Sequence, residues 1–238
     1  MGIVRGLAAI GGFAVIGGTA SSVLRTLVVP RGITSSLSER VLDTVVRLCR
    51  MAGKLTRSYE RRDQVLAWAA PLALMSTLLS WLLAFWLGFS LDDYAFSPLN
   101  FTDSMRQAGS SIATLGFATT PHAGLTTLDV VASLTGMIVV ALQIAYLPTL
   151  YSAYNRRETL VTVLAGRAGE PSWGPEILAR HAWLGLLESL PELYREWEQW
   201  AATVSESHTS YPILIHFRSP QPLRSWLVSL LGVMDAAA

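Results

Sequence analysis

Charged side chains are scarce in this chain. Only 15% of its 238 residues are Asp, Glu, Lys or Arg, whereas soluble domains carry about 25%. The shortage is concentrated in a few long uncharged segments, and the mean hydropathy is +0.40. Membrane-spanning segments explain this distribution better than a large soluble core does.

Other absences narrow the choice of function. Cys49 is the single cysteine, which excludes a disulfide within the chain. The net charge of +1 gives no strong attraction to nucleic acid. The sequence has no Gly-x-Gly-x-x-Gly, Walker loop, EF-hand or CxxC motif, and its four histidines are not spaced as zinc ligands. We therefore expect no cofactor, no resident metal and no nucleic-acid partner. An enzyme is the poorest reading, because no predicted span carries a paired catalytic set.

Three uncharged segments are long enough to cross a bilayer. Gly6 to Leu24 has 19 residues, Gln64 to Leu91 has 28, and Val130 to Asn155 has 26. About 20 apolar residues cross the hydrocarbon core. A Lys, Arg or Asp at the centre of a span costs roughly 2.5–3.5 kcal/mol. The absence of charge therefore predicts membrane spans, with membrane lipids as the surrounding partner.

The flanking charges predict the orientation. The segment from Arg25 to Arg62 has nine Lys or Arg against three acids, and Arg156 and Arg157 follow the third uncharged segment. The segment from Asp92 to Asp129 has the opposite bias, with four aspartates and one arginine. Positive flanks stay in the cytoplasm. We therefore expect a multi-pass protein of the plasma or inner membrane, with the N-terminus outside and the C-terminal tail cytoplasmic.

The first 62 residues predict two elements. Residues 1–30 predict an N-terminal span in which Gly11, Gly12, Gly17 and Gly18 allow close helix contact. A signal peptide and an interfacial helix are the alternatives for this segment. Residues 31–62 have apolar side chains at helical spacing with basic residues between them. This pattern predicts a basic amphipathic helix on the cytoplasmic surface.

Residues 63–155 predict a module of two spans with a short helix and a polar turn between them. The short helix runs from Phe101 to Ala113, with Asp103 as its N-cap. Its C-terminal end points inward at Thr114, where the helix dipole favours a cation. Non-helical backbone at membrane depth is tolerated only where it is buried in protein or lines water. We therefore predict an all-α integral membrane protein whose order is span, pore helix, re-entrant loop, span.

The order span, short helix, Thr-Leu-Gly-Phe, span resembles the two-transmembrane pore-loop cation channels, whose usual filter reads Thr-Val-Gly-Tyr-Gly-Asp. Within this resemblance, Thr114 matches the filter threonine, Leu115 the valine, Gly116 the first glycine and Phe117 the tyrosine. The resemblance covers Gln64 to Asn155. It implies a homotetramer, in which four loops surround one axis and their carbonyl groups replace the hydration shell of the ion.

The chain departs from that filter after Phe117. Ala118 stands where the second glycine belongs, and Thr119 stands where the acid belongs. A non-glycine residue in a left-handed conformation costs about 1–2 kcal/mol, so we expect a different shape at the outer end. The related Trk-type potassium transporters also have single-glycine filters, but they place four repeats in one chain. The expected cargo is a monovalent cation, with potassium as the candidate, and Phe117 is expected to wedge against the surrounding helices.

Three residues of the third segment predict local features. Gly136 is either a hinge of the inner helix or a contact point with a neighbour. Gln143, a polar side chain deep in the segment, either faces a wet cavity or bonds to another helix. Pro148 removes a backbone hydrogen bond and should kink the inner end.

Residues 156–238 predict a helical cytoplasmic tail. Ser189 to Glu192 has the spacing of a capping box, and the residues after it form an apolar stripe at helical spacing. The acidic face of this helix is a candidate partner for the basic segment near the N-terminus. Tyr211 to Phe217 predicts a strand or an extended connector, and Leu223 to Met234 predicts a short apolar helix. The chain ends inside that last helix, so it is a candidate fragment of a longer protein.

Two functions remain open from the sequence. The first is an ion channel subunit that passes monovalent cations through a tetrameric pore. The second is a non-conducting membrane protein whose tail binds a cytoplasmic protein, with Thr114 to Thr120 as an ordinary external turn. The intact Thr-Leu-Gly-Phe segment favours the first function, and Ala118 favours the second.

Overall fold

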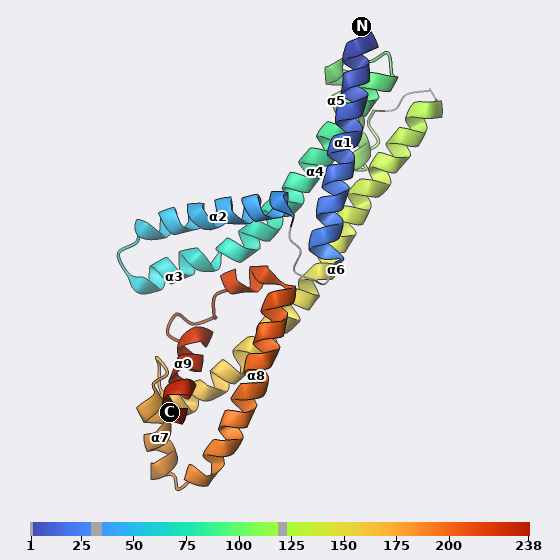
Figure 1. Cartoon of the computed structure of the whole chain (residues 1–238). Helices are drawn as coiled ribbons and strands as arrows, with labels where there is room; N and C mark the ends of the chain where they lie inside the picture. Colours follow the sequence, from blue (N-terminus) through green and yellow to red (C-terminus); the bar gives the residue numbers. More distant parts are fainter. Residues whose placement is uncertain (1, 30–34, 119–122) are drawn as a thin grey trace. The chain divides into compact units, whose positions relative to one another are not determined.

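The computed structural model describes residues 2–29, 35–118 and 123–238, and the regular elements within them are helices (Figure 1). Three helices in this described part are long and apolar enough to cross a membrane. They are Gly2–Leu27, Tyr59–Phe96 and Gly124–Ala168. The prediction of an all-α membrane protein is confirmed at this level. Thr119 and Thr120 lie outside the described residues.

The chain forms two compact units, each built from two separate stretches of sequence. The first unit comprises Met1–Thr44 and Ala73–Leu147. The second unit comprises Val45–Leu72 and Pro148–Ala238. The expected boundary at residue 155 falls inside a helix, because α6 runs without interruption from Ala123 to Ala168. Pro148 lies inside this helix, at the point where the first unit ends.

The first unit contains α1 (Gly2–Leu27), α4 (Ala69–Phe96), α5 (Phe101–Ile112) and the first half of α6. These four helices run from blue through teal and green to yellow-green in Figure 1. Aromatic side chains of α4 form the centre of their shared core. The buried members are Trp81, Phe85, Phe89, Val23, Ala108, Ala132 and Val139. Each of the four helices therefore contributes to one core.

Glycines bring α1 and α4 into close contact. A Cβ atom at Gly12 would lie 2.0 Å from Oδ1 of Asp92, and a Cβ atom at Gly88 would lie 2.7 Å from Cγ1 of Ile16. Further along the same pair, the Trp81 indole donates a hydrogen bond to the Ser22 hydroxyl at 2.8 Å. Gly12 therefore confirms the expectation that small residues of the first segment allow close helix packing, whereas no atom lies within 4 Å of a Cβ atom added at Gly17 or Gly18.

The basic segment forms two helices where the sequence predicted one. The first, α2 (Ser36–Lys54), is amphipathic, and the hydroxyl of Ser35 accepts a hydrogen bond from the backbone N–H of Ser38. The second, α3 (Tyr59–Ala67), begins at Ser58, whose hydroxyl accepts from the N–H of Arg61. A capping serine between two helical stretches offers the backbone an alternative partner, which ends one helix and starts the next.

The second unit packs the second half of α6 against α7 (Gly174–Trp183), α8 (Leu190–Ser210) and α9 (Trp226–Ala237). The predicted apolar stripe of α8 faces this core, as its helical spacing requires. The buried members of the core are Val161, Leu164, Ala168, Ile177, Leu193, Trp197, Trp200, Val204, Val233 and Ala236.

Two expectations for the tail are wrong in detail. Ser189 does not cap α8, because its hydroxyl donates to the carbonyl of Leu186 while a short 3-10 helix, η1 (Leu187–Ser189), leads into α8. The run expected to be a strand or connector forms a second 3-10 helix, η2 (Pro212–His216). Pro212 explains the latter, since a proline fits the first turn of a helix but removes a ladder hydrogen bond from a strand.

Candidate functional site

The candidate ion-pathway residues, Thr114 to Ala118, follow directly after α5. This helix is capped by Asn100, and Asp103 is not the cap as the sequence suggested. The Asn100 side chain accepts from the N–H of Asp103 at 2.9 Å, and its amide donates to the Asp103 carboxylate at 2.9 Å. Asp103 therefore occupies the third helical position, where its negative charge favours the helix N-terminus.

A hydrogen bond to the backbone of α5 holds this helix against α4. The indole of Trp86 donates to the carbonyl of Met105 at 2.8 Å. A Cβ atom at Gly109 would lie 3.2 Å from the same indole nitrogen. The small residue therefore lets the Trp86 ring lie close to the helix backbone.

α5 is held against α6 by side-chain hydrogen bonds to one carboxylate. Gln107 donates to Oδ2 of Asp129 at 2.5 Å, and Ser111 donates to Oδ1 of Asp129 at 2.8 Å. Ser133 of α6 donates to the carbonyl of Ser111 at 2.8 Å. Gln107 and Ser111 are both buried. Asp129, which the sequence placed among the outside charges, therefore anchors α5.

Gly136 is a contact point between α6 and the end of α5. A Cβ atom there would lie 2.3 Å from the carbonyl oxygen of Ile112, which is closer than real Cβ contacts. Of the two interpretations left open for this glycine, the structure supports the contact. Gly136 lies twelve residues after Gly124, where the span begins, which is about 18 Å along a helix. The end of α5 therefore lies well inside the length of α6.

The turn after α5 places its backbone strain on Thr114. The N–H of Leu115 donates to the carbonyl of Ser110 at 2.8 Å, and the N–H of Thr114 donates to that of Ser111 at 2.9 Å. This is the hydrogen-bond pattern of a Schellman motif, in which the residue after the helix is left-handed and usually glycine. Here that residue is Thr114, with φ of 53°. A positive φ is a genuine outlier for a β-branched residue.

Ser110 joins both ends of the candidate loop. Its carbonyl accepts the N–H of Leu115, at the start of the loop. Its hydroxyl accepts the N–H of Ala118 at 3.0 Å and lies 3.4 Å from the Ala118 carbonyl, at the far end. Ser110 is 1% exposed. Ser110 is not among the residues that the sequence predicted for the site, although a serine in the last turn of a predicted pore helix is a signal that could have identified it.

The left-handed residues of the loop are Thr114 and Gly116, with φ of 53° and 69°. Ala118 is not among the positive-φ residues of the described chain, so the residue at the second-glycine position carries no left-handed strain, and the strain lies at Thr114 instead. The side chains of Leu115 and Phe117 are 65% and 59% exposed. Phe117 therefore does not wedge against the helices of its own chain. The exposed loop leaves two large apolar side chains without a partner within this chain.

Three further polar side chains of the first unit are buried. Gln143 is 5% exposed, so a single chain already shields it from solvent. Asp92 and Asp93, expected among the charges outside the membrane, lie in the last turns of α4 and are 0% and 1% exposed. The α4 helix continues to Phe96, which turns these carboxylates into the helix packing instead of into solvent.

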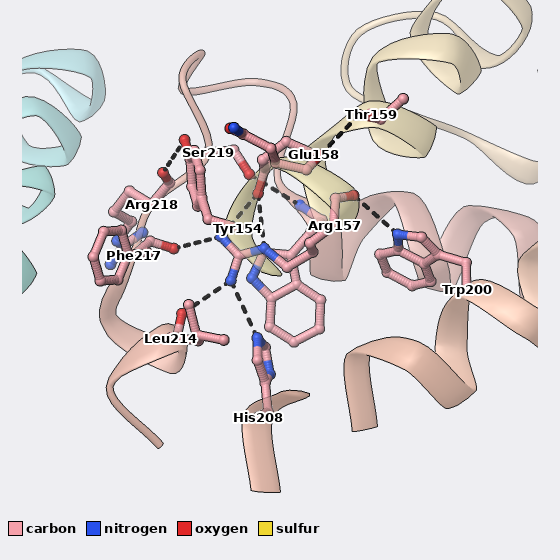
Figure 2. A network of polar contacts seen from close by, with 12 residues as sticks. Tyr154, Arg157, Glu158, Thr159, Trp200, His208, Leu214, Phe217, Arg218 and Ser219 are labelled. Atoms are coloured by element: carbon pink, nitrogen blue, oxygen red, sulfur yellow. Dashed lines mark hydrogen bonds and ion pairs between the residues drawn. The ribbon is translucent and has the colours of Figure 1, made fainter. Parts of the chain in front are cut away.

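A polar network in the second unit centres on Arg157, which the sequence treated as a flanking charge (Figure 2). Its guanidinium is 2% exposed and donates to the carbonyls of Leu214 and Phe217 at 2.9 and 2.8 Å. It also forms an ion pair with Glu158 at 2.8 Å and lies 5.3 Å from the centroid of the Trp226 ring. One buried cation therefore connects α6 with η2 and α9.

His208 lies at the edge of this network. Its Nε2 is 3.3 Å from Nη1 of Arg157 (Figure 2). Its ring packs edge-on against Trp226. Burial and the adjacent Arg157 charge lower the pKa of His208 to about 4. The histidine is therefore neutral at physiological pH. His208 therefore packs within the tail as an uncharged side chain.

The sequence predicted that acidic residues of α8 pair with the basic segment near the N-terminus. The ion pair that joins α3 to the tail is a different one. That pair has the opposite polarity, since the acid is Asp63 of α3 and the base is Arg218, with Nη1 and Oδ1 2.9 Å apart. Asp63 is 7% exposed. Tyr59 of α3 also donates to the carbonyl of Pro222 at 3.3 Å.

Comparison with known proteins gives one relative. The chain matches no family model and no solved structure. It is 25% identical over 187 residues to a protein of Bacillus subtilis (strain 168) described as "Uncharacterized membrane protein YdjJ". The matched region covers 73% of this chain and 53% of that protein, so the chain spans about half the length of the relative. This similarity agrees with the three apolar helices in indicating a membrane protein.

Proposed function

We propose that the chain is a subunit of a homotetrameric channel that passes monovalent cations, with potassium as the candidate ion. The ions would pass Thr114, Leu115, Gly116, Phe117 and Ala118. The tail would lie in the cytoplasm and the N-terminus outside, in a plasma or inner membrane. The observation that carries the proposal is the loop itself. Thr114 is held in a strained conformation just after a helix whose end contacts α6 at Gly136, well inside the length of α6.

The strain supports a function for this loop. A non-glycine residue in the left-handed region costs about 1–2 kcal/mol, and such residues persist where the surrounding structure holds them in place. Here the holding groups are Ser110, Ser111 and Asp129, all within hydrogen-bond distance of one another or of the loop. An ordinary connector has no need of a strained turn fastened at both ends.

The exposure of Leu115 and Phe117 supports an assembly of several copies. Both side chains are large and apolar, and both are exposed next to a turn that lies inside the length of α6. Neighbouring copies around a shared axis would cover them. Four copies would also bring the carbonyl groups of the loop together, which is how such filters replace the water around an ion.

Cation flux into liposomes that contain the purified protein tests the proposal. We expect flux above that of empty vesicles, and we expect Gly116→Asp to abolish it. Gly185→Asp is the matched control, because Gly185 also has positive φ (67°, against 69° at Gly116) and also has no atom within 4 Å of an added Cβ. The control introduces the same residue and the same backbone strain outside the loop. Wild-type flux equal to that of empty vesicles would reject the channel.

Chemical cross-linking tests the number of subunits. A ring of four loops requires a tetramer, so the purified protein in detergent should give cross-linked products up to four chains. A stable monomer or dimer is incompatible with the proposed pore.

The second candidate function is a non-conducting membrane protein whose tail binds a cytoplasmic protein. A patch of exposed apolar residues between α7 and α8 favours it. Trp183 and Leu184 are 79% and 71% exposed, and Leu186 and Leu187 beside them are also exposed. Contiguous exposed apolar side chains mark sites of protein or membrane contact.

Photo-crosslinking in native membranes separates the two candidates. A photoreactive residue at position 183 should capture a different protein if the tail is a docking site. Position 198 is the control, because Glu198 is also exposed but lies on the polar face of α8. Capture of lipid or of further copies of this chain alone would count against a docking tail.

A further inference from the structure

A cavity of about 300 Å³ lies within the second unit, between the helices near the N-terminal side of α4 and the tail. One wall comes from α2, α3 and the first residue of α4, and the other comes from η2 and the segment that leads into α9. Ligand sites in proteins have volumes of about 300–1,000 Å³. The cavity is therefore large enough to hold a small ligand or the headgroup of a lipid.

Both walls of the cavity are held in place by bonds within the chain. The buried guanidinium of Arg157 donates to the carbonyl of Phe217, which lies in the tail wall (Figure 2). Asp63 of α3 and Arg218 of the tail both line the cavity, and their Oδ1 and Nη1 atoms are 2.9 Å apart. A site whose walls are already fixed loses less entropy when a ligand binds.

Arg50 of α2 gives the lining a positive charge that nothing balances. The lining contains two arginines and one carboxylate, and that carboxylate, Asp63, is already paired with Arg218. Among the residues that the structure describes, the guanidinium of Arg50 has no hydrogen-bond or ion-pair partner. The hydroxyl of Ser225, also in the lining, does not cap α9. Because a guanidinium presents a planar fork of donors that matches a phosphate, the cavity favours a phosphate-bearing anion.

The cavity is also lined by apolar residues from a candidate membrane span. Leu66 and Ala69 lie within Tyr59–Phe96, which is long and apolar enough to cross a membrane. They follow Arg61 and Arg62, at the point in the sequence where the uncharged stretch begins. Basic residues next to a span mark the boundary between lipid and water, where anionic headgroups lie. A phospholipid headgroup combines the required negative charge with this position.

We propose that the cavity binds the headgroup of an anionic phospholipid, with its phosphate on the guanidinium of Arg50. Arg218 and the hydroxyl of Ser225 donate from the tail wall. The bound headgroup connects α2 with the tail and adds to the attachment that Asp63 and Arg218 already provide. A zwitterionic headgroup fits less well, because its own cation competes with Arg50 for the phosphate. The inference goes beyond the proposed channel, since it concerns a lipid ligand of the second unit and not the ion path.

Native mass spectrometry of the full chain in a neutral detergent tests the lipid preference. The two probes are dioleoylphosphatidylglycerol and dioleoylphosphatidylcholine, which share their acyl chains and differ in net charge. The wild type should retain the phosphatidylglycerol in preference to the phosphatidylcholine. Arg50→Gln should lower this preference by about fivefold, the factor expected for one basic side chain at an anionic headgroup.

Arg40→Gln is the matched control for this measurement. Arg40 is exposed on the same helix as Arg50 and carries the same charge, but it does not line the cavity. The control should keep the lipid preference of the wild type. A wild type without a preference would overturn the proposal. Equal losses in the two variants would also overturn it, because they would show only a general attraction to a basic surface.

Thermal unfolding followed by tryptophan fluorescence separates a lipid from a soluble phosphate. Phosphatidylglycerol should raise the melting temperature of the wild type more than that of Arg50→Gln, whereas inorganic phosphate at the same concentration should raise neither. Without lipid the two proteins should melt together, since the guanidinium of Arg50 bonds to none of the described residues. An equal rise with phosphatidylglycerol in both proteins, or a rise with inorganic phosphate that Arg50→Gln abolishes, would reject the lipid site. Neither measurement depends on ion flux, so this proposal and the channel can fail separately.

Discussion

Thr114 has a strained backbone and an exposed side chain at the candidate ion path. Its backbone is left-handed, with φ of 53°, and its hydroxyl donates to the carbonyl of Ala113 at 2.8 Å. Its side chain is exposed. A side chain that lies at the candidate ion path and holds an unfavourable backbone conformation is expected to trade stability for function.

Replacement of Thr114 by glycine should therefore raise stability and harm selectivity. Glycine removes the left-handed penalty of about 1–2 kcal/mol and loses part of this gain through its greater freedom in the unfolded chain, about 0.5–1 kcal/mol. We expect an equal or higher melting temperature together with a lower preference between potassium and sodium in liposome flux. Thr114→Ser retains the hydroxyl and should keep more of the selectivity. A lower melting temperature of Thr114→Gly would contradict the assigned strain.

Ser110 positions the loop without lining it. Ser110→Ala removes the acceptor for the N–H of Ala118, which is partly buried. A fully buried donor left without a partner costs about 1–3 kcal/mol, so the cost here should be smaller. We expect loss of ion selectivity while the protein still assembles. Ser104→Ala is the control, because Ser104 is also fully buried on α5 but its hydroxyl bonds only to the carbonyl of Asn100. Equal selectivity of Ser110→Ala and the control would exclude a positioning role.

The packing of α5 against its neighbours depends on residues without side chains. Gly136 and Gly109 let the backbone of Ile112 and the ring of Trp86 approach, and Gly12 and Gly88 do the same between α1 and α4. Apolar burial alone does not favour one helix pair over another inside a membrane, so close contact between small residues contributes much of the specificity.

Gly136→Ala should displace α5. The new Cβ would lie 2.3 Å from the carbonyl oxygen of Ile112, which is backbone and cannot rotate away. Overpacking of this kind costs typically about 1–3 kcal/mol, so we expect a lower melting temperature in detergent. Gly166→Ala in the same helix is the control, because no atom lies within 4 Å of its added Cβ. There the helix preference for alanine should raise stability by about 0.5–1 kcal/mol. Equal melting temperatures of the two variants would contradict the contact.

The second unit is a helical domain stabilised by a core and by one buried cation. The rings of Trp197 and Trp200 pack at an interplanar angle of 53° with their centroids 4.6 Å apart, and the Trp200 indole donates to the carbonyl of Arg157 at 2.9 Å. Arg157 therefore makes hydrogen bonds within this unit through both its backbone carbonyl and its guanidinium (Figure 2). A substitution that removes the Arg157 guanidinium would leave the carbonyl groups of Leu214 and Phe217 and the carboxylate of Glu158 without this donor. Breaking a buried ion pair in this way strongly destabilises a folded protein.

The stability of this unit should depend on pH through His208. Its pKa is lowered to about 4 in the folded protein, against 6.5 for the ordinary side chain. Above about pH 6.5 both the folded and unfolded chains hold a neutral histidine, so the contribution is fully present. Between these values the unfolded chain binds a proton that the folded chain does not, and stability falls as the pH is lowered.

Thermal unfolding followed by tryptophan fluorescence measures this effect. We expect the melting temperature of the wild type to fall as the pH is lowered from about 6.5 towards about 4. His208→Gln retains a polar side chain that does not titrate, so the fall in melting temperature should be smaller. A melting temperature with the same pH dependence in both proteins would show that His208 is not responsible.

The linear pattern of residues was enough to predict helices and membrane spans. Hydropathy and helical spacing are properties of consecutive residues, so the three apolar helices, α5 and the buried stripe of α8 follow from local sequence. The same applies to the position of the Thr-Leu-Gly-Phe segment directly after α5. Helix ends were less predictable, because several side chains compete to cap them: Asn100 did so in place of Asp103, and Ser189 did not.

The partners of individual polar residues depended on contacts between segments far apart in the chain. Charge counting placed Asp92, Asp93 and Asp129 outside the membrane, yet the fold buries the first two and makes the third an anchor for α5. Arg157 was counted as a flanking charge and is buried among carbonyl groups of residues 214 and 217. Burial and hydrogen bonding are decided by which helices meet, and that choice rests on close packing between distant residues, which spacing along one helix does not reveal.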